Sequence, residues 1–302
     1  GTEKSFRNLI RCYGIDEEVI KLNAYGNNST FKFEDTYSDA TVRKNYIDFN
    51  HPDRFDGIVY QRPSSNPETT GISYISGTNA NFANTAEAEI VFPKKMDFSN
   101  KQYFLTPFVS ASLFGTHTAK ASATDFGWVT TGNDYGLQAY FVKTAEEAKD
   151  GHFVLKNRAG TINLTSSVFA DVYDNQKWNL AVRVKDGKYP YASGVTGSDD
   201  SNNVTVEFVG YNIELGVTRN EFSVSATGLR DNYLTARRRY YAGADRTNTL
   251  GAAVTKTDVR VSSVRHYAHY LEDSVLLAHA KDPTNFGVGR ANKNIIFSAN
   301  DA

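Results

Sequence analysis

The chain has 302 residues, of which 13% are aromatic and 22% are charged, a globular composition large enough for one sizeable β domain with an appendage, or for two small domains. Its net charge of −1 provides no excess of positive charge that would attract nucleic acid or an anionic membrane surface. The single cysteine, Cys12, excludes an intrachain disulfide framework and a cysteine-based zinc site, and we expect it to be a small buried residue.

Residues 1–62 read as an N-terminal arm that is rich in β structure. Within it, "STFKFED" alternates, with Phe31 and Phe33 on one side and charged residues on the other. The stretch "QRPSSNPETTG" that ends at Gly71 carries two prolines and two serines, which predicts a linker over residues 63–71.

From about residue 72 the chain becomes a series of short strands with turn signals between them. We expect strands over 87–92, 103–114, 135–142, 152–157, 178–185, 203–211, 221–228, 237–244 and 257–264. Two runs alternate most regularly and direct their apolar residues inward, namely Trp178, Leu180, Val182 and Val184, and Val204, Val206 and Phe208. The pattern predicts a mainly β fold, an antiparallel sandwich over residues 72–282.

One short helix is expected near the C-terminal end of the sandwich, within "LEDSVLLAHAKD". Glu272 and Asp273 fall in its first turn and Lys281 in its last, which suits the helix dipole. Pro283 then ends the helix, so residues 283–302 form a C-terminal tail.

Three of the six histidines lie just before and within this helix, at His266, His269 and His279. His266 and His269 are three residues apart where the chain leaves a strand, so in an extended chain they point to opposite faces. His279 follows ten residues later. This spacing does not match a zinc ligand pair, and we interpret the segment as the closing strand and helix of the fold.

Several segments resemble the concanavalin A-like (laminin G and pentraxin-like) jelly rolls. The strand "DVRVSSVRHYAHYL", which runs into a short acidic-capped helix, is similar to the closing segment of that family. "YYAGADRTN" resembles its preceding strand and turn, and "KWNLAVRV" its central tryptophan-bearing strand. The resemblance implies a concanavalin A-like jelly-roll sandwich.

A second resemblance extends over more of the chain. "SFRNLIRCYGIDEEVIKLN", "SASLFGTHTA", "FADVYDNQKWNLAVRV" and "YLEDSVLLAHAKDPTNFG" are similar to large structural proteins of marine T4-like tailed phages. It implies a structural protein of a virus particle, in a tail, baseplate or decorating position. It also implies a piece of a longer polypeptide, located in the virion, whose partners are its own copies, neighbouring virion proteins and host-surface glycans.

Two alternatives to a structural role stay open: a carbohydrate-binding module and a glycoside hydrolase. Glu87 and Glu89 alternate on one strand, as carboxylates do in some glucanases of this fold. The full pattern Glu-x-Asp-x-x-Glu is missing, because Phe92 stands where the last glutamate belongs. We therefore expect no enzymatic activity, and place both glutamates on the solvent face of a strand.

For a sugar site, an aromatic platform with amide groups is needed, and His117, Trp128, Asn133 and Tyr135 offer one in neighbouring loops. Core packing of Trp128 is the alternative. If Trp128 is part of a sugar site, its ring should be exposed to solvent.

Two charged stretches could form a calcium site or a basic patch. Asp199 and Asp200 in "GSDDSNN" could hold Ca²⁺, the one cofactor that the sequence suggests, although a flexible polar loop explains the same residues. The three arginines at 237–239 alternate along a strand, so we expect a solvated or ion-paired surface rather than a basic patch.

Overall fold

The computed structural model describes residues 3–14, 24–26, 29–31, 45–61, 83–94, 108–118, 128–129, 134–187, 189, 203–214, 216–236, 238–248, 250–267 and 269–282. It divides into two compact units, Gly1–Lys44 and Asn45–Ala302. The division lies before residue 45, whereas the sequence placed the end of the arm at residue 62. The reason is that two short strands between residues 45 and 61 pair with strands from far along the chain.

The first unit contains a helix, α1 (Glu3–Cys12), and a pair of short antiparallel strands, β1 (Ala24–Gly26) and β2 (Ser29–Phe31). The helix was not predicted. Cys12 is exposed at the end of α1, so the expectation that it is a buried small residue was wrong. The cysteine belongs to a short helix of the first unit and not to the core of the sandwich.

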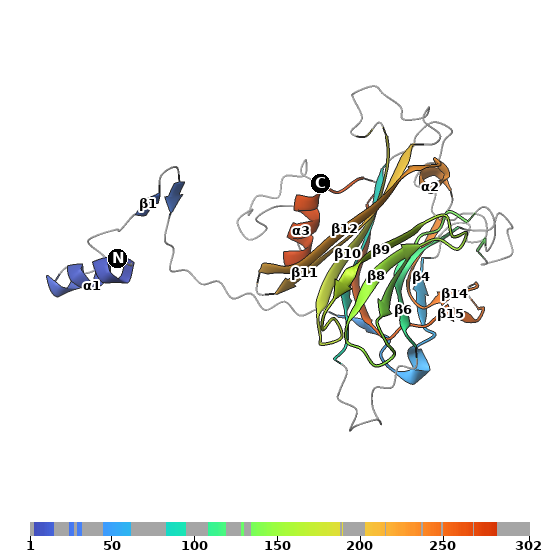
Figure 1. Cartoon of the computed structure of the whole chain (residues 1–302), viewed down its shortest axis with the longest axis horizontal. Helices are drawn as coiled ribbons and strands as arrows, with labels where there is room; N and C mark the ends of the chain where they lie inside the picture. Colours follow the sequence, from blue (N-terminus) through green and yellow to red (C-terminus); the bar gives the residue numbers. More distant parts are fainter. Residues whose placement is uncertain are drawn as a thin grey trace. The chain divides into compact units, whose positions relative to one another are not determined.

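The second unit is a sandwich of two six-stranded antiparallel sheets (Figure 1). The first sheet has the order β12 (Val217–Leu229), β11 (Val204–Glu214), β10 (Lys177–Asp186), β5 (Asn84–Val91), β16 (Arg260–Tyr267) and β3 (Ile47–Asp48). The second has the order β4 (Ile58–Tyr60), β13 (Arg238–Gly243), β6 (Ser110–Thr118), β7 (Gln138–Lys143), β8 (Gly151–Lys156) and β9 (Asn163–Phe169).

Smaller elements complete this unit. They are a 3-10 turn at Pro52–Arg54, helix α2 (Asn232–Thr235), and the two-stranded pair β14 (Asp245–Arg246) and β15 (Ala253–Thr255). The mainly β, antiparallel sandwich that the sequence predicted is confirmed. Strands β4 and β9 and helix α2 were not anticipated, because each is short or mixes polar with apolar residues without a clear period.

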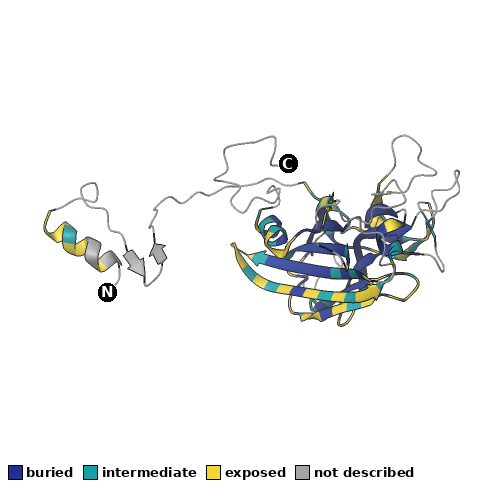
Figure 2. Cartoon of the chain, turned by 90° about the horizontal axis from the view of Figure 1, so that it is seen from above, coloured by how far each residue is buried: buried dark blue, intermediate teal, exposed yellow. Residues whose placement is uncertain are grey.

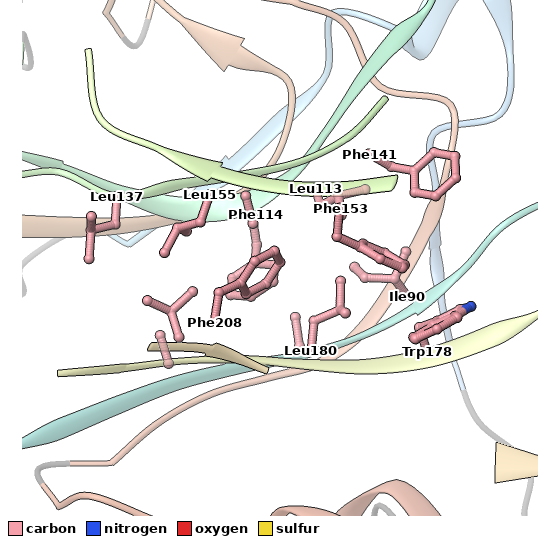
Figure 3. Close-up of a cluster of buried hydrophobic side chains, with 14 of the residues drawn as sticks. Ile90, Leu113, Phe114, Leu137, Phe141, Phe153, Leu155, Trp178, Leu180 and Phe208 are labelled. Atoms are coloured by element: carbon pink, nitrogen blue, oxygen red, sulfur yellow. The ribbon is translucent and has the colours of Figure 1, made fainter. Parts of the chain in front are cut away.

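The core lies between the two sheets and is rich in aromatic rings (Figure 3). Trp178, Leu180, Val182 and Val184 of β10 all point into it, as their alternation predicted, and so do Val204, Val206 and Phe208 of β11. Phe153 of β8 meets Trp178 across the sandwich, with 4.7 Å between ring centroids. Burial of this apolar surface, at roughly 25 cal/mol per Å², is the main force that holds the sheets together.

Helix α3 (Asp273–Lys281) packs on the outer face of the first sheet, over β10 and β11. Leu271, Leu276 and Ala280 meet Ala181, Val209 and Tyr211 there in a second, smaller cluster. Arg183, which is buried, donates to the carbonyl oxygen of Leu271 at 2.9 Å and to Asp273 Oδ1 at 2.6 Å. The segment with three histidines is thus the closing strand and helix of the sandwich, as the sequence indicated.

Among the residues that the structure describes, no helix is both long and apolar enough to cross a membrane.

Candidate binding groove

His117 and Trp128, two of the residues predicted to bind sugar, are each only 1% exposed. Their rings stack on each other at 4.4 Å between centroids, and the other face of His117 stacks on Tyr241, also at 4.4 Å. Trp128 Nε1 donates to the carbonyl oxygen of Arg246 at 2.6 Å. The structure therefore brings these two residues together, but neither ring has an open face to offer a sugar.

Tyr135 is half-buried and packs against the core between the two sheets. Its ring meets Tyr233 edge-on at 5.4 Å, and the Tyr233 hydroxyl accepts a hydrogen bond from Asn157. Asn133, the fourth predicted sugar-binding residue, and the predicted calcium ligands Asp199 and Asp200 lie outside the described residues. Tyr135 is therefore the one predicted residue with accessible surface in the described part of the chain.

Asp245 is the centre of a buried polar cluster on the outer face of the second sheet. It accepts hydrogen bonds from Arg158 at 2.6 Å and from the Tyr140 hydroxyl at 2.8 Å. Burial, reinforced by the neighbouring Tyr241 and Asp245, raises the pKa of Tyr140 well above its usual value. The arginine and the tyrosine thus satisfy this carboxylate.

His117 lies 3.3 Å from Asp245 but makes no hydrogen bond through either ring nitrogen. Burial, followed by the positive charge of Arg158, lowers its pKa well below the usual value. Because Asp245 is already held by Arg158 and Tyr140, desolvation outweighs its attraction for a proton on the ring. His117 is therefore a neutral stacking residue.

Glu87 and Glu89 of β5 are 2% and 0% exposed, so the expectation that they lie on a solvent face was wrong. They do face outward from the first sheet, but neighbouring side chains cover them. Glu87 accepts from Asn179 at 2.7 Å and lies 2.9 Å from Nδ1 of His279, whereas Glu89 accepts from the Tyr46 and Ser262 hydroxyls. Both carboxylates are held by structural contacts.

The three C-terminal histidines are in different surroundings: His279 beside Glu87, His266 against the ring of Tyr240, and His269 against the ring of Tyr189. Within the described residues there is no group of three or more His, Cys, Asp or Glu side chains that could hold a metal ion. Arg238 and Arg239 were expected to be solvated or ion-paired, and at 1% exposure each, they are not solvated. They lie opposite Thr118 and His117 of β6.

A groove of about 510 Å³ lies where the two sheets come to an end on one side of the sandwich. Strands β4 and β13 of the second sheet form one wall, and β3 and β16 of the first sheet form the other. Val59 pairs with Ala242, and Ile47 with Val261, both of which belong to the core. Among the described residues, the groove is therefore the margin of the core, beside the edge strands β3 and β4.

Apolar side chains at this margin stay accessible: Ile47 is 44% exposed, Val59 47% and Val264 43%. Tyr240 lines the groove from β13. Tyr60 is paired with Tyr241, so its ring lies on the outer face of the second sheet, where Tyr241 stacks on His117. Polar groups also reach it, from Asn45, Gln61, Ser263 and Arg265. Its size and its mixture of apolar, aromatic and a few polar groups are typical of a small-ligand site.

His266 lines the groove from β16, and its environment defines what chemistry it offers. Burial, followed by the charge of Arg238, lowers the pKa of His266 to about 3. A general base works best when its pKa is near the working pH, so this imidazole is a weak base at neutral pH. The lining of the groove includes no aspartate or glutamate among the described residues.

Sequence reasoning missed the groove because its residues come from two distant stretches, 45–61 and 240–266, which only the sheet order brings together. A signal was present in "GIVYQ", which carries a short β-branched run and a tyrosine before an amide. That run was assigned to the arm and so was not considered as a wall of the sandwich.

No family model and no curated protein sequence matches the chain. Among solved structures it is similar to the enzymatically active domain of tailspike protein 2 from bacteriophage CBA120, with 13% identity and a TM-score of 0.40 over 74% of this chain and 29% of the tailspike chain. The chain thus spans less than a third of that protein.

Two further similar structures are small domains. One is the CBM40 domain of the Ruminococcus gnavus IT-sialidase, with 13% identity and a TM-score of 0.34 over 70% of this chain and 97% of that one. The other is arcelin-5, a lectin-like defense protein from Phaseolus vulgaris, with 12% identity and a TM-score of 0.34 over 74% and 96%. At these levels the comparisons identify neither a ligand nor an activity for this chain.

Proposed function

We propose that this chain is a non-enzymatic structural protein of a virus particle, in a tail, baseplate or decorating position, whose lectin-like sandwich binds carbohydrate of the host surface. The groove between β4 and β16 is the proposed binding site. The observation that carries the proposal is that this groove combines the ring of Tyr240 with the amides of Asn45 and Gln61. An aromatic ring suits the C–H face of a sugar, and amides both donate to and accept from its hydroxyls.

Binding rather than catalysis is favoured by where the carboxylates lie. Hydrolysis of a glycosidic bond ordinarily needs two carboxyl groups that face each other across the substrate. Glu87 and Glu89 are buried and hydrogen-bonded to neighbouring side chains, and Asp245 is held by Arg158 and Tyr140. None of these three lines the groove.

The virion part of the proposal is supported by the sequence segments that resemble structural proteins of T4-like phages. A multi-copy particle also explains how a shallow site with few polar groups could be useful, because many weak contacts together give a strong attachment.

The groove is tested by screening the purified chain on a glycan array together with Asn45→Ala and Gln61→Ala. Each variant should weaken binding to the positive glycans about tenfold or more, since each removes a direct contact. Tyr135→Ala is the matched control, because it removes a half-buried tyrosine at the site that the sequence predicted. Loss of binding in Tyr135→Ala with normal binding in Gln61→Ala would assign the site to the loops near Tyr135 instead.

The virion role is tested separately by imaging particles with a gold-labelled antibody against the chain. Label at a fixed position on the particle is the expected result. Particles that carry no label, in a culture in which the protein is made, would contradict the role.

A further inference from the structure

Strand β12 forms one edge of the first sheet and is 13 residues long. At about 3.4 Å per residue it extends for about 44 Å. Its only neighbour in the sheet is β11, and within the described part of the chain no backbone hydrogen bond reaches its outer edge. Exposed and half-buried residues alternate along it, and Figure 2 shows this banding on the sandwich. Within the described residues it is thus a long strand whose outer row of backbone donors and acceptors has no strand partner.

The central run of β12, Asn220–Ala226, lacks the features that usually protect such an edge. Its register with β11 is regular, and the two shifts in that pairing lie outside the run. It contains no lysine and no proline, and its one charged residue is Glu221. Natural sheets generally place charges, prolines or bulges on exposed edges to prevent pairing with another chain.

The same run is held firmly from the inside. Phe222 is 8% exposed and stacks on Phe153 with 4.9 Å between centroids and 17° between planes. Gly210, directly opposite on β11, leaves room for this ring, because an added Cβ would lie 2.3 Å from Phe222. The edge is therefore a rigid template rather than a fraying strand, which lowers the entropic cost of pairing.

We propose that β12 pairs antiparallel with β12 of a second copy of this chain, around a twofold axis at Ser223. This register places Ser223 opposite Ser223, and Glu221 opposite Ser225 on both sides of the axis. The exposed hydroxyl of Ser225 can donate to the carboxylate of Glu221, twice by symmetry, and no two like charges face each other. Two six-stranded sheets then join into one of twelve strands.

Such an interface is isologous, so it closes after two copies and consumes the open edge. The resulting dimer carries two grooves and is the smallest multi-copy form of the role proposed above. It does not depend on what the groove binds, since β12 and the groove lie at opposite edges of the first sheet.

The test uses the fact that residue 223 faces itself in this register. Ser223→Lys and Ser223→Asp each place two like charges at the axis, and each should weaken dimerisation at least about tenfold in sedimentation velocity. A mixture of the two variants should dimerise again, because each heterodimer places a lysine opposite an aspartate. Failure of the mixture to dimerise, with both single variants folded, would overturn the register.

Ser167→Lys is the matched control, since Ser167 is exposed on β9, the edge strand of the other sheet, and should leave the dimer intact. A dimer lost in Ser167→Lys and kept in Ser223→Lys would overturn the proposal in favour of β9. A wild-type chain that stays monomeric at all concentrations would overturn it as well. Glycan binding by each variant reports separately on the groove, so the failure of one proposal is distinguishable from the failure of the other.

Discussion

The outer faces of the two sheets each bury a histidine, but they do so in different ways. On the first sheet His279 lies 2.9 Å from Glu87, under helix α3, and Arg183 is paired there with Glu207 and Asp273. On the second sheet His117 is held between the rings of Trp128 and Tyr241, and the carboxylate beside it is held by other groups. One histidine thus has a carboxylate as its partner, and the other has only stacking.

This difference means that the same substitution should have unequal consequences at the two positions. A neutral, stacked imidazole can be replaced by another flat ring, whereas a histidine beside a buried carboxylate cannot be removed without leaving that carboxylate short of a partner.

The largest effect is expected from Asp245→Asn, which removes the charge that Arg158 and Tyr140 share on the second sheet. Loss of one member of a buried pair should lower the free energy of unfolding by about 3–5 kcal/mol, because Arg158 keeps an uncompensated charge. Urea denaturation followed by fluorescence of the buried tryptophans measures it. Asp174→Asn is the control, since Asp174 pairs with Lys94 at the surface, and it should leave the free energy of unfolding nearly unchanged.

Next in size is His279→Phe on the first sheet. The ring volume is kept, but Glu87 loses one of its two partners while Asn179 stays in place. We expect the free energy of unfolding to fall by about 2–3 kcal/mol. A variant as stable as the wild type would show that the Glu87–His279 contact contributes little.

Acidification should lower the free energy of unfolding through His117, the histidine that has only stacking partners. His117 has a folded pKa far below that of the unfolded chain, so the unfolded state alone binds a proton once the pH falls below about 6.5. Its contribution to stability is complete above that pH and is lost at about 1.4 kcal/mol per pH unit as the pH falls towards the folded pKa. His266, with a pKa of about 3, adds a loss of the same sign over the window from about 6.5 to 3.

The measurement is urea denaturation of the wild type and of His117→Phe between neutral pH and mild acid. The slope of stability against pH should be shallower in His117→Phe, since one of the two buried neutral histidines is gone. Equal slopes in both proteins would mean that His117 accepts a proton in the folded state.

The smallest effect is expected for His117→Phe at neutral pH. Phenylalanine keeps the stack with Trp128 and Tyr241, and neither ring nitrogen of His117 makes a hydrogen bond that could be lost. The free energy of unfolding should change by less than about 1 kcal/mol. A loss comparable with that of His279→Phe would show that the two sites are held by the same kind of contact.

Much of the fold could be predicted from the sequence where periodicity was strong. The alternation of Trp178 through Val184 fixed both the strand and its buried face, and the charges at Asp273 and Lys281 marked the ends of α3. Strand β9 was missed because its residues are mostly polar and follow no clear period, although its partner β8 comes directly before it. The short β3 and β4 were missed because their place in a sheet depends on partners more than 100 residues away, as Arg260 is from Asp48.

The site was harder to predict than the fold, for a physical reason. Exposure of an aromatic ring depends on what lies above it, and alternation along one strand does not reveal that. Trp128 is covered, although its neighbours in the sequence suggested a sugar site. Glu87 and Glu89 were placed on the correct side of their strand, but side chains from distant parts of the chain cover that side, His279 at Glu87 and Tyr46 and Ser262 at Glu89.

The most direct test of the proposed binding function is a crystal structure of the chain soaked with a glycan that is positive on the array. We predict density for the sugar between β4 and β16, with a ring against Tyr240 and hydroxyls within hydrogen-bond distance of Asn45 or Gln61. Density at the loops beside Tyr135, with an empty groove, would contradict the assignment of the site.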